Sequence, residues 1–126
     1  MGLDIYFSKQ KKEEEDTWEE LAYFRKVNCL VAFFEKHYGY DRNDVEMPIT
    51  KDMCKHLVEL CQLALDNPEE AEKYMPNTGG FFFGSTLYDD SYFEDLGYVI
   101  ESVKKSVIPA FHDLKDDEEI VFVTSW

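Results

Sequence analysis

Apolar and polar residues alternate at both ends of the chain. Leu3, Ile5 and Phe7 occupy every second position near the start, and residues 120–126 alternate in the same way near the end. A period of two is typical of a strand that buries one of its faces. Neither strand can satisfy its backbone hydrogen bonds alone, so the pattern predicts that the two terminal strands pair in one small sheet.

Helical spacing of apolar residues follows the first strand. After a charged connection at residues 9–15, Thr17 and Glu20 stand at the spacing of a capping box. Apolar positions then recur every three or four residues up to Tyr38, and Gly39 is a favourable helix end. The pattern predicts a long helix from Thr17 to Tyr38.

Three further helices are predicted downstream, each from its own start signal. Residues 40–49 are polar and contain Pro48, which is typical of a loop. Pro76 should end the third helix near Met75, and Pro109 should kink or end the fourth. The start signals are Thr50 for the second helix, Asn67 with Pro68 and Glu70 for the third, and Ser91 with Glu94 for the fourth.

These patterns predict an α+β fold in which three to four helices pack on a small sheet formed by the N- and C-terminal strands. The chain of 126 residues has the length of one domain and shows no repeat or linker, so residues 1–126 are interpreted as a single domain. Its aromatic content of 16% argues for a packed core despite the high charge.

The net charge of −14, from 27 acidic and 13 basic residues, sets the kind of partner to expect. Such a charge repels nucleic-acid phosphate and anionic lipid, so direct binding to nucleic acid or membrane is not expected. A basic surface of another protein is attracted. The alternative interpretation is that the acidic residues serve solubility alone.

Many of the acidic residues fall in three runs, at residues 13–20, 41–46 and 113–119. Solvated surface is the usual role of such runs. The sharper hypothesis is that they imitate a nucleic-acid backbone, which requires carboxylates along one rigid face, because DNA carries one charge per ~1.7 Å of its axis. A continuous acidic face would favour the second interpretation over the first.

The three cysteines are an odd number and lie in apolar helical patterns, which fits reduced thiols in the cytoplasm. The chain starts without a basic region followed by an apolar stretch, and no apolar run approaches the ~20 residues of a membrane helix. We therefore expect a cytoplasmic protein that binds no membrane.

Cys54, His56 and Cys61 raise the question of a zinc site, but no second Cys/His pair with ligand spacing accompanies them. Core packing is the better interpretation of these cysteines. A Cys–His nucleophilic pair with His37, His56 or His112 has no positive support in the spacing. No cofactor is predicted.

Residues 79–86, which we call the aromatic–glycine loop, form the most unusual segment of the chain. Glycines before a helix can cradle phosphate through backbone amides, but the Lys-Ser/Thr ending of a P-loop is missing. The segment is otherwise interpreted as a tight connection that buries two phenylalanines, as a short third strand around residues 81–83, or as a surface for a partner.

Acidic and aromatic residues continue from this loop into the predicted fourth helix. The acids could cap the helix, bind magnesium or calcium, or form a paired-carboxylate active site, although the EF-hand spacing is absent. The candidate partner-binding residues of the region are Phe81, Phe82, Phe83, Tyr88, Asp89, Asp90, Tyr92, Glu94 and Asp95.

Several segments together carry a family resemblance. They are residues 1–6, 21–26, 80–86, 88–89, 92–96 and 125–126. With them, nearly the whole chain resembles a family of small, acidic, uncharacterised proteins encoded by bacteriophages and prophages. The resemblance implies a phage context, expression in the cytoplasm of a bacterial host, and a role against host defence or host machinery. It carries no catalytic residues with it.

The leading hypothesis is a non-enzymatic acidic interaction protein, of the anti-CRISPR or DNA-mimic type, that engages the basic surface of a host protein. The alternative is a small enzyme, or a nucleotide- or metal-binding module, that uses the Gly79–Thr86 loop and the Asp89–Asp95 acids. A virion assembly protein is a third hypothesis. An exposed strand edge leaves both a monomer and a homodimer open.

Overall fold

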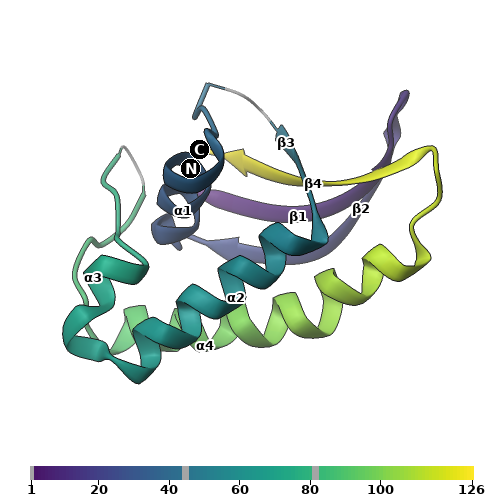
Figure 1. The fold of residues 1–126 in the computed structure, drawn as a ribbon. Helices are drawn as coiled ribbons and strands as arrows, with labels where there is room; N and C mark the ends of the chain where they lie inside the picture. Colours follow the sequence, from purple (N-terminus) through teal and green to yellow (C-terminus); the bar gives the residue numbers. More distant parts are fainter. Residues whose placement is uncertain (1, 44–45, 81–82) are drawn as a thin grey trace.

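The computed structural model describes residues 2–43, 46–80 and 83–126, apart from the side chains of residues 15 and 16. In these ranges, four strands form one antiparallel sheet in the order β2-β1-β4-β3 (Figure 1). The strands are β1 (Asp4–Lys11), β2 (Glu14–Arg25), β3 (Glu46–Ile49) and β4 (Glu118–Ser125). The predicted α+β class and the pairing of the terminal strands are confirmed.

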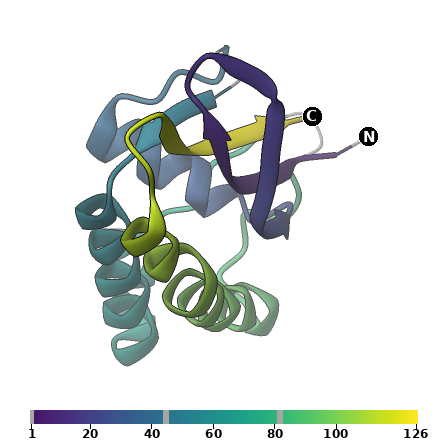
Figure 2. The same ribbon diagram turned by 90° about the vertical axis from the view of Figure 1, so that its right-hand side faces the viewer.

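All the helices lie on one side of this sheet (Figure 2). They are α1 (Asn28–Tyr38), α2 (Lys51–Asp66), the short α3 (Ala71–Tyr74) after a 3₁₀ turn at Pro68–Glu70, and α4 (Asp90–Ser102). The α4 axis continues through a π-helical turn at Val103–Val107 and a 3₁₀ segment at Ile108–Asp113. Thus Pro109 neither kinks nor ends α4 itself, which stops at Ser102.

The core lies between the helices and one face of the sheet. Phe7 of β1 and Phe122 of β4 are paired across the sheet, and Phe34 of α1 stacks on Phe122 with 4.2 Å between ring centroids. All three rings are fully buried. Burial of each such side chain contributes about 1.5–3 kcal/mol, so these contacts hold α1 against the centre of the sheet.

The prediction of a helix from Thr17 to Tyr38 is wrong in its first half. Residues 14–25 form β2, and helix α1 begins only at Asn28. The Thr17 hydroxyl does not cap a helix. It accepts a hydrogen bond from the Lys11 backbone N–H (2.8 Å) and donates one to the Glu14 carbonyl (2.8 Å), which closes the β1–β2 hairpin.

The prediction of a loop over residues 40–49 is also wrong at its end, where β3 pairs with β4. Pro48 lies in this strand, and proline is tolerated there because β3 is at the edge of the sheet. The short third strand considered at residues 81–83 falls mostly outside the described residues, and Phe83 is not in a strand.

Of the predicted helix starts, one is confirmed and two are wrong in the capping residue. Thr50 caps α2 as predicted, accepting a hydrogen bond from the Met53 backbone N–H. Asn67 does not cap the next turn, because its side chain donates instead to the Leu63 carbonyl at the end of α2. The cap of α4 is Asp89, two residues before the predicted Ser91, and Glu94 takes no part in it.

The face of the sheet away from the helices, which we call the open face, carries a different set of residues. Tyr6, Trp18 and Tyr23 form a cluster there, with 5.3 Å between the ring centroids of Tyr6 and Trp18 and 5.1 Å between those of Tyr6 and Tyr23. Ser8 and Val121 are paired at its centre and are fully buried. No helix of the described residues is long and apolar enough to cross a membrane.

Candidate functional site

The aromatic–glycine loop is fixed by the side chain of Asn28, the first residue of α1. The Asn28 amide nitrogen donates to the carbonyls of Phe83 (3.2 Å) and Ser85 (2.9 Å), and its oxygen accepts from the Thr78 backbone N–H (3.0 Å). Asn28 is 2% exposed, and its bond to the Phe83 carbonyl is buried while those to Ser85 and Thr78 are partly buried, so water does not freely replace this partner. One side chain therefore holds both ends of the loop.

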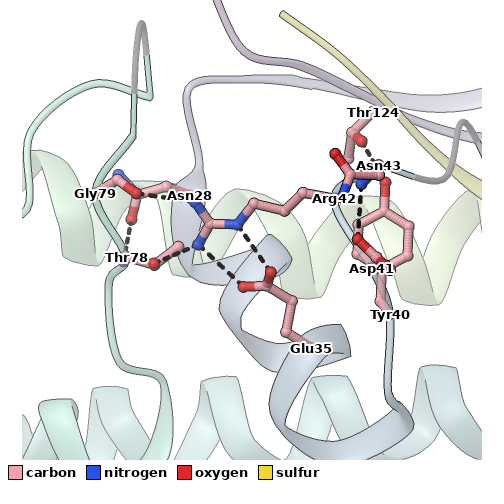
Figure 3. A network of polar contacts seen from close by, with 9 residues as sticks. All are labelled: Asn28, Glu35, Tyr40, Asp41, Arg42, Asn43, Thr78, Gly79 and Thr124. Carbon is pink, nitrogen blue, oxygen red and sulfur yellow. Dashed lines mark hydrogen bonds and ion pairs between the residues drawn. The ribbon is translucent and has the colours of Figure 1, made fainter.

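Arg42 clamps the same loop from its other side (Figure 3). Its guanidinium donates to both carboxylate oxygens of Glu35 (2.8 and 3.1 Å), to the Gly79 carbonyl (3.0 Å) and to the Thr78 hydroxyl (2.6 Å). It also lies 4.8 Å from the centroid of the Phe83 ring. The hydrogen bond to Glu35 raises the pKa of Arg42, so the clamp stays charged.

The loop phenylalanines do not form one exposed patch. Phe83 is 2% exposed and packs edge-on against Trp126, with 5.4 Å between ring centroids. Phe81 and Phe82 lie outside the described residues. Phe83 is thus part of the core, and the prediction of a connection that buries two phenylalanines rests for its second ring on residues outside the described ranges.

The two tyrosines predicted for the site, Tyr88 and Tyr92, form hydrogen bonds to the backbone just before the loop. The Tyr88 hydroxyl accepts a hydrogen bond from the Asn77 backbone N–H (3.0 Å), and the buried Tyr92 hydroxyl donates to the Met75 carbonyl (2.6 Å). Their rings contact each other edge-on at 4.9 Å. Burial raises the pKa of Tyr92, so this hydroxyl remains a hydrogen-bond donor.

A cavity of about 240 Å³, which we call the loop cavity, lies between this loop, the β2–α1 turn and the start of α4. Charged residues of both signs line it. Its lining comprises Arg25, Lys26, Val27, Asn28, Cys29, Asn77, Gly84, Ser85, Leu87, Asp89, Ser91, Tyr92 and Asp95. Three of the sequence-predicted site residues, Asp89, Tyr92 and Asp95, therefore line one cavity, whereas Tyr88, Asp90 and Glu94 do not.

The acidic residues around the start of α4 have separate roles. Asp89 caps the helix, accepting from the Tyr92 backbone N–H at 3.1 Å, while Asp90 and Glu94 are exposed. Asp95 is half-buried, and none of the described residues hydrogen-bonds to its carboxylate or forms an ion pair with it. Burial, followed by the charges of Glu94 and Asp89, raises the pKa of Asp95.

Lys26 lines the same cavity and has an unusual backbone. Its φ of 58° lies in the left-handed region, which non-glycine residues seldom adopt. Its backbone N–H donates to the Leu3 carbonyl at 2.7 Å, so the turn from β2 into α1 is tied to the first strand. Across the cavity wall, Gly84 also has a positive φ, and a Cβ there would stand 3.0 Å from the Lys26 Cβ.

Carboxylates from two of the acidic runs lie together at the end of the sheet that carries the β1–β2 hairpin and the start of β4, and Gln10 links them to Glu46, which pairs with Val123 farther along β4. The buried Gln10 amide donates to the carboxylates of Glu46 (3.0 Å) and Glu119 (2.9 Å), which come from two different runs. The Lys12 backbone N–H donates to the Asp117 carbonyl at 2.8 Å, which joins the β1–β2 hairpin to the start of β4. We call this region the acidic end. Its carboxylates are Glu13, Glu14, Glu20, Glu46, Asp116, Asp117 and Glu119.

A groove of about 340 Å³ crosses the acidic end. It is lined by Lys11, Lys12, Glu13, Glu14, Asp116 and Asp117. The lysines only partly offset these acids. The closest Lys11–Glu14 nitrogen–oxygen distance is 4.0 Å and both side chains are exposed. Exposed pairs of this kind contribute little stability, so the carboxylates there remain available to a cation from outside.

The cysteines and histidines do not assemble into a reactive site. All three cysteines are buried, and burial raises the pKa of Cys54 and of Cys61 to about 12, so these thiols stay protonated at neutral pH. His37 and His56 contact each other edge-on at 4.8 Å between ring centroids. Among the described residues, no group of three or more His, Cys, Asp or Glu side chains is placed to hold a metal ion.

Sequence reasoning missed Asn28, Arg42 and Lys26. Nothing in the local pattern around them signals a role, because their partners are far away in the chain or depend on the backbone conformation. Comparisons with known proteins add no further assignment. No protein-family model matches the chain, and searches of curated proteins and of solved structures found no match.

Proposed function

We propose that the protein is a non-enzymatic interaction module that binds a basic segment of another protein on the open face and the acidic end of its sheet. The observation that carries this proposal is that carboxylates of the β1–β2 hairpin and of the start of β4 lie together at one end of a sheet face on which Trp18 is exposed. Scattered acids would have supported a solubility role alone.

Trp18 supplies the anchor for such a partner. The Trp18 side chain is 43% exposed and contacts Tyr6 edge-on, so its ring is held in place while much of its surface meets solvent. A tryptophan face attracts an arginine or lysine cation by about 0.5–1 kcal/mol at an exposed site. Tryptophan is also among the residues that most often concentrate binding energy at interfaces.

The acidic end supplies charge complementarity. Glu20 lies two residues after Trp18 on β2 and opposite Ser8. The Gln10 side chain of β1 donates to Glu119 on the neighbouring β4 and to Glu46 on β3, the strand beyond it. Carboxylates placed on a rigid sheet attract a basic segment before contact and orient it, so they raise the association rate more than the final affinity. Binding is therefore expected to weaken as salt screens these charges.

The finer proposal concerns the identity of the partner. A basic groove that normally binds nucleic acid presents closely spaced lysines and arginines, and the acidic end would occupy it in place of phosphates. The resemblance to phage-encoded proteins makes a defence or nucleic-acid-handling protein of a bacterial host the first candidate. In this proposal the protein inhibits its target by competition and performs no reaction of its own.

The two tryptophans allow a direct test. Trp18 and Trp126 are the two tryptophans of the chain. Trp126 is 45% exposed and lies two positions after Thr124, which faces the helix side of the sheet. Trp126→Phe leaves Trp18 as the reporter, and Trp18→Phe leaves Trp126. Titration with nona-arginine at low salt should change the Trp18 fluorescence and leave the Trp126 fluorescence almost unchanged. Nona-glutamate and a short DNA duplex should change neither.

A second set of variants measures how much Trp18 and Glu20 contribute to the affinity for nona-arginine. Trp18→Ala together with Glu20→Gln should weaken nona-arginine binding about tenfold, whereas Trp126→Ala, matched in residue type and exposure, should not. Circular dichroism would verify that each variant remains folded. Equal responses of the two tryptophans, or binding that survives the loss of Trp18 and Glu20, would contradict a site on the open face.

A further inference from the structure

Two residues that line the loop cavity are unfavourable for folding. Asp95 carries a half-buried carboxylate with no partner among the described residues, and Lys26 holds a left-handed backbone. Each feature costs free energy that a simple substitution would recover. Costs of this kind persist most often where they serve binding or catalysis.

The cost at Lys26 is in the backbone. A left-handed conformation costs an ordinary residue about 1–2 kcal/mol, while glycine adopts it freely and asparagine more readily than most. The lysine side chain is exposed, and its methylenes lie against Gly84 at the cavity wall and against Gly2. It forms no ion pair with the residues that the structure describes. If only the shape of the turn mattered, glycine at this position would give a more stable protein than lysine.

The cost at Asp95 is electrostatic. Its charged form is desolvated and is repelled by the neighbouring carboxylates Asp89 and Glu94. The floor of the cavity beside it is apolar, since Val27, Cys29 and Tyr92 are buried. An unpaired carboxylate over such a floor attracts a ligand cation more strongly than an exposed carboxylate would.

We propose that the loop cavity binds a small amino-carboxylate, with its ammonium group on Asp95 and its carboxylate on Lys26. The ligand relieves both unbalanced charges at once. The size agrees, because about 240 Å³ is below the ~300–1,000 Å³ of pockets for drug-sized molecules. This site is separate from the open face and does not depend on the function proposed for it.

Other polar groups around the cavity narrow the ligand class. Asn28 and Tyr92 already use their side chains on backbone groups of the loop. Asp89 caps the start of α4 and places a negative charge where a phosphate would otherwise meet the helix amides. Asp89 therefore disfavours a nucleotide phosphate at the start of α4. The other charged residues of the lining are Asp95, Lys26 and Arg25, and Arg25 also lies 3.6 Å from the Asp4 carboxylate.

The test uses the full chain, isotopically labelled, with defined probes. Backbone amide spectra are recorded with the twenty amino acids and with ω-amino acids from glycine to 6-aminohexanoate. At least one probe should shift the amides around Lys26, Ser85 and Asp95 with a Kd below about 1 mM. The matching amine without a carboxylate, and the matching acid without an ammonium group, should each bind at least about tenfold more weakly.

Four variants test whether Asp95 and Lys26 bind the charged groups of the ligand. Asp95→Asn and Lys26→Asn should each weaken the best probe about tenfold or more, while Asp90→Asn, outside the cavity, and Lys26→Arg should keep most of the affinity. Asp95→Asn and Lys26→Asn should also raise the midpoint of urea unfolding, because each removes a cost. A purely structural role for these residues would instead lower that midpoint.

Three outcomes would overturn the proposal. One is the absence of any localised shift up to about 10 mM of every probe. The second is equal binding by an amine or an acid that lacks the other charged group. The third is unchanged affinity in Asp95→Asn or Lys26→Asn. Quenching of Trp18 by nona-arginine should be the same in all four variants, so failure here leaves the open-face proposal standing.

Discussion

At the aromatic–glycine loop, one buried asparagine meets three backbone groups, whereas on the open face of the sheet the buried Ser8 hydroxyl has no hydrogen-bond partner among the described residues. Both groups are shielded from water. The loop is thus held by bonds that the chain makes to itself. The open face combines the fully buried Ser8 and Val121 with exposed residues such as Trp18, and its buried Ser8 hydroxyl adds no hydrogen bond to the fold.

This difference indicates how mutations in the two regions should behave. Changes to the groups that hold the loop should lower the free energy of unfolding and distort the loop cavity as a secondary effect. Substitutions at exposed positions of the open face, such as Trp18, should leave the protein folded, so their effects on binding can be measured directly.

The largest effect is expected for Asn28→Ala. It leaves the Thr78 N–H and the Phe83 and Ser85 carbonyls without their partner, and should lower the free energy of unfolding by about 3 kcal/mol. Urea denaturation followed by circular dichroism measures this. Asn43→Ala is the matched control, because Asn43 is exposed, and it should change stability by less than about 0.5 kcal/mol.

A small effect of Asn28→Ala, similar to that of the control, would break the comparison. It would mean that the loop is held mainly by the Arg42 clamp. Arg42 and Glu35 are each about 30% exposed in their side chains, at 30% and 29%, so solvent weakens that ion pair more than it weakens the bonds of Asn28. We therefore expect Asn28 to contribute more than Arg42.

An effect of opposite sign is expected for Ser8→Ala. The hydroxyl is buried without a hydrogen bond, and its removal should raise the free energy of unfolding by about 1 kcal/mol. Ser125→Ala, an exposed serine on β4, is the control and should be nearly neutral. A loss of stability in Ser8→Ala would show that the hydroxyl has a partner, and that the two regions are built alike.

The sequence was sufficient for the elements whose signals are local. Alternation at the two ends predicted β1 and β4, and the hydroxyl of Thr50 predicted the start of α2. It was insufficient for β2, because the spacing of Leu21 and Phe24 fits a helix. In the structure, a register shift between Phe7 and Ser8 leaves Leu21 without a partner on β1, so the strand loses its strict alternation there.

The candidate site was harder to predict because its geometry is made by distant contacts. Asn28 reaches Phe83 across 55 positions and Arg42 reaches Gly79 across 37. No local pattern encodes such contacts, and the left-handed backbone of Lys26 has no signal in its residue type. Asp95 was predicted as part of an acidic group, but only the structure separates it from Asp89, which caps the helix.

The smallest effect on stability is expected for Asp95→Asn, and it depends on pH. The pKa of Asp95 is raised in the folded state above its usual 3.8, first by burial and then by the carboxylates of Glu94 and Asp89. The other charged or titratable groups around the cavity are Arg25 at the end of β2, Lys26 on the turn, Cys29 on α1 and Tyr92 on α4. The folded state therefore holds the proton more tightly than the unfolded state does.

It follows that the wild-type protein has this contribution to stability below pH 3.8 and loses it as pH rises through the folded-state pKa. Asp95→Asn should match the wild type at low pH and exceed it at neutral pH, by less than about 1 kcal/mol because the side chain is partly exposed to solvent. Asp90→Asn, an exposed neighbour, should not reproduce this pattern. If the two variants had the same pH dependence, Asp95 would carry no cost that a ligand could relieve. Asp95 would then resemble Asn28 and Arg42, whose side chains hold the described part of the loop.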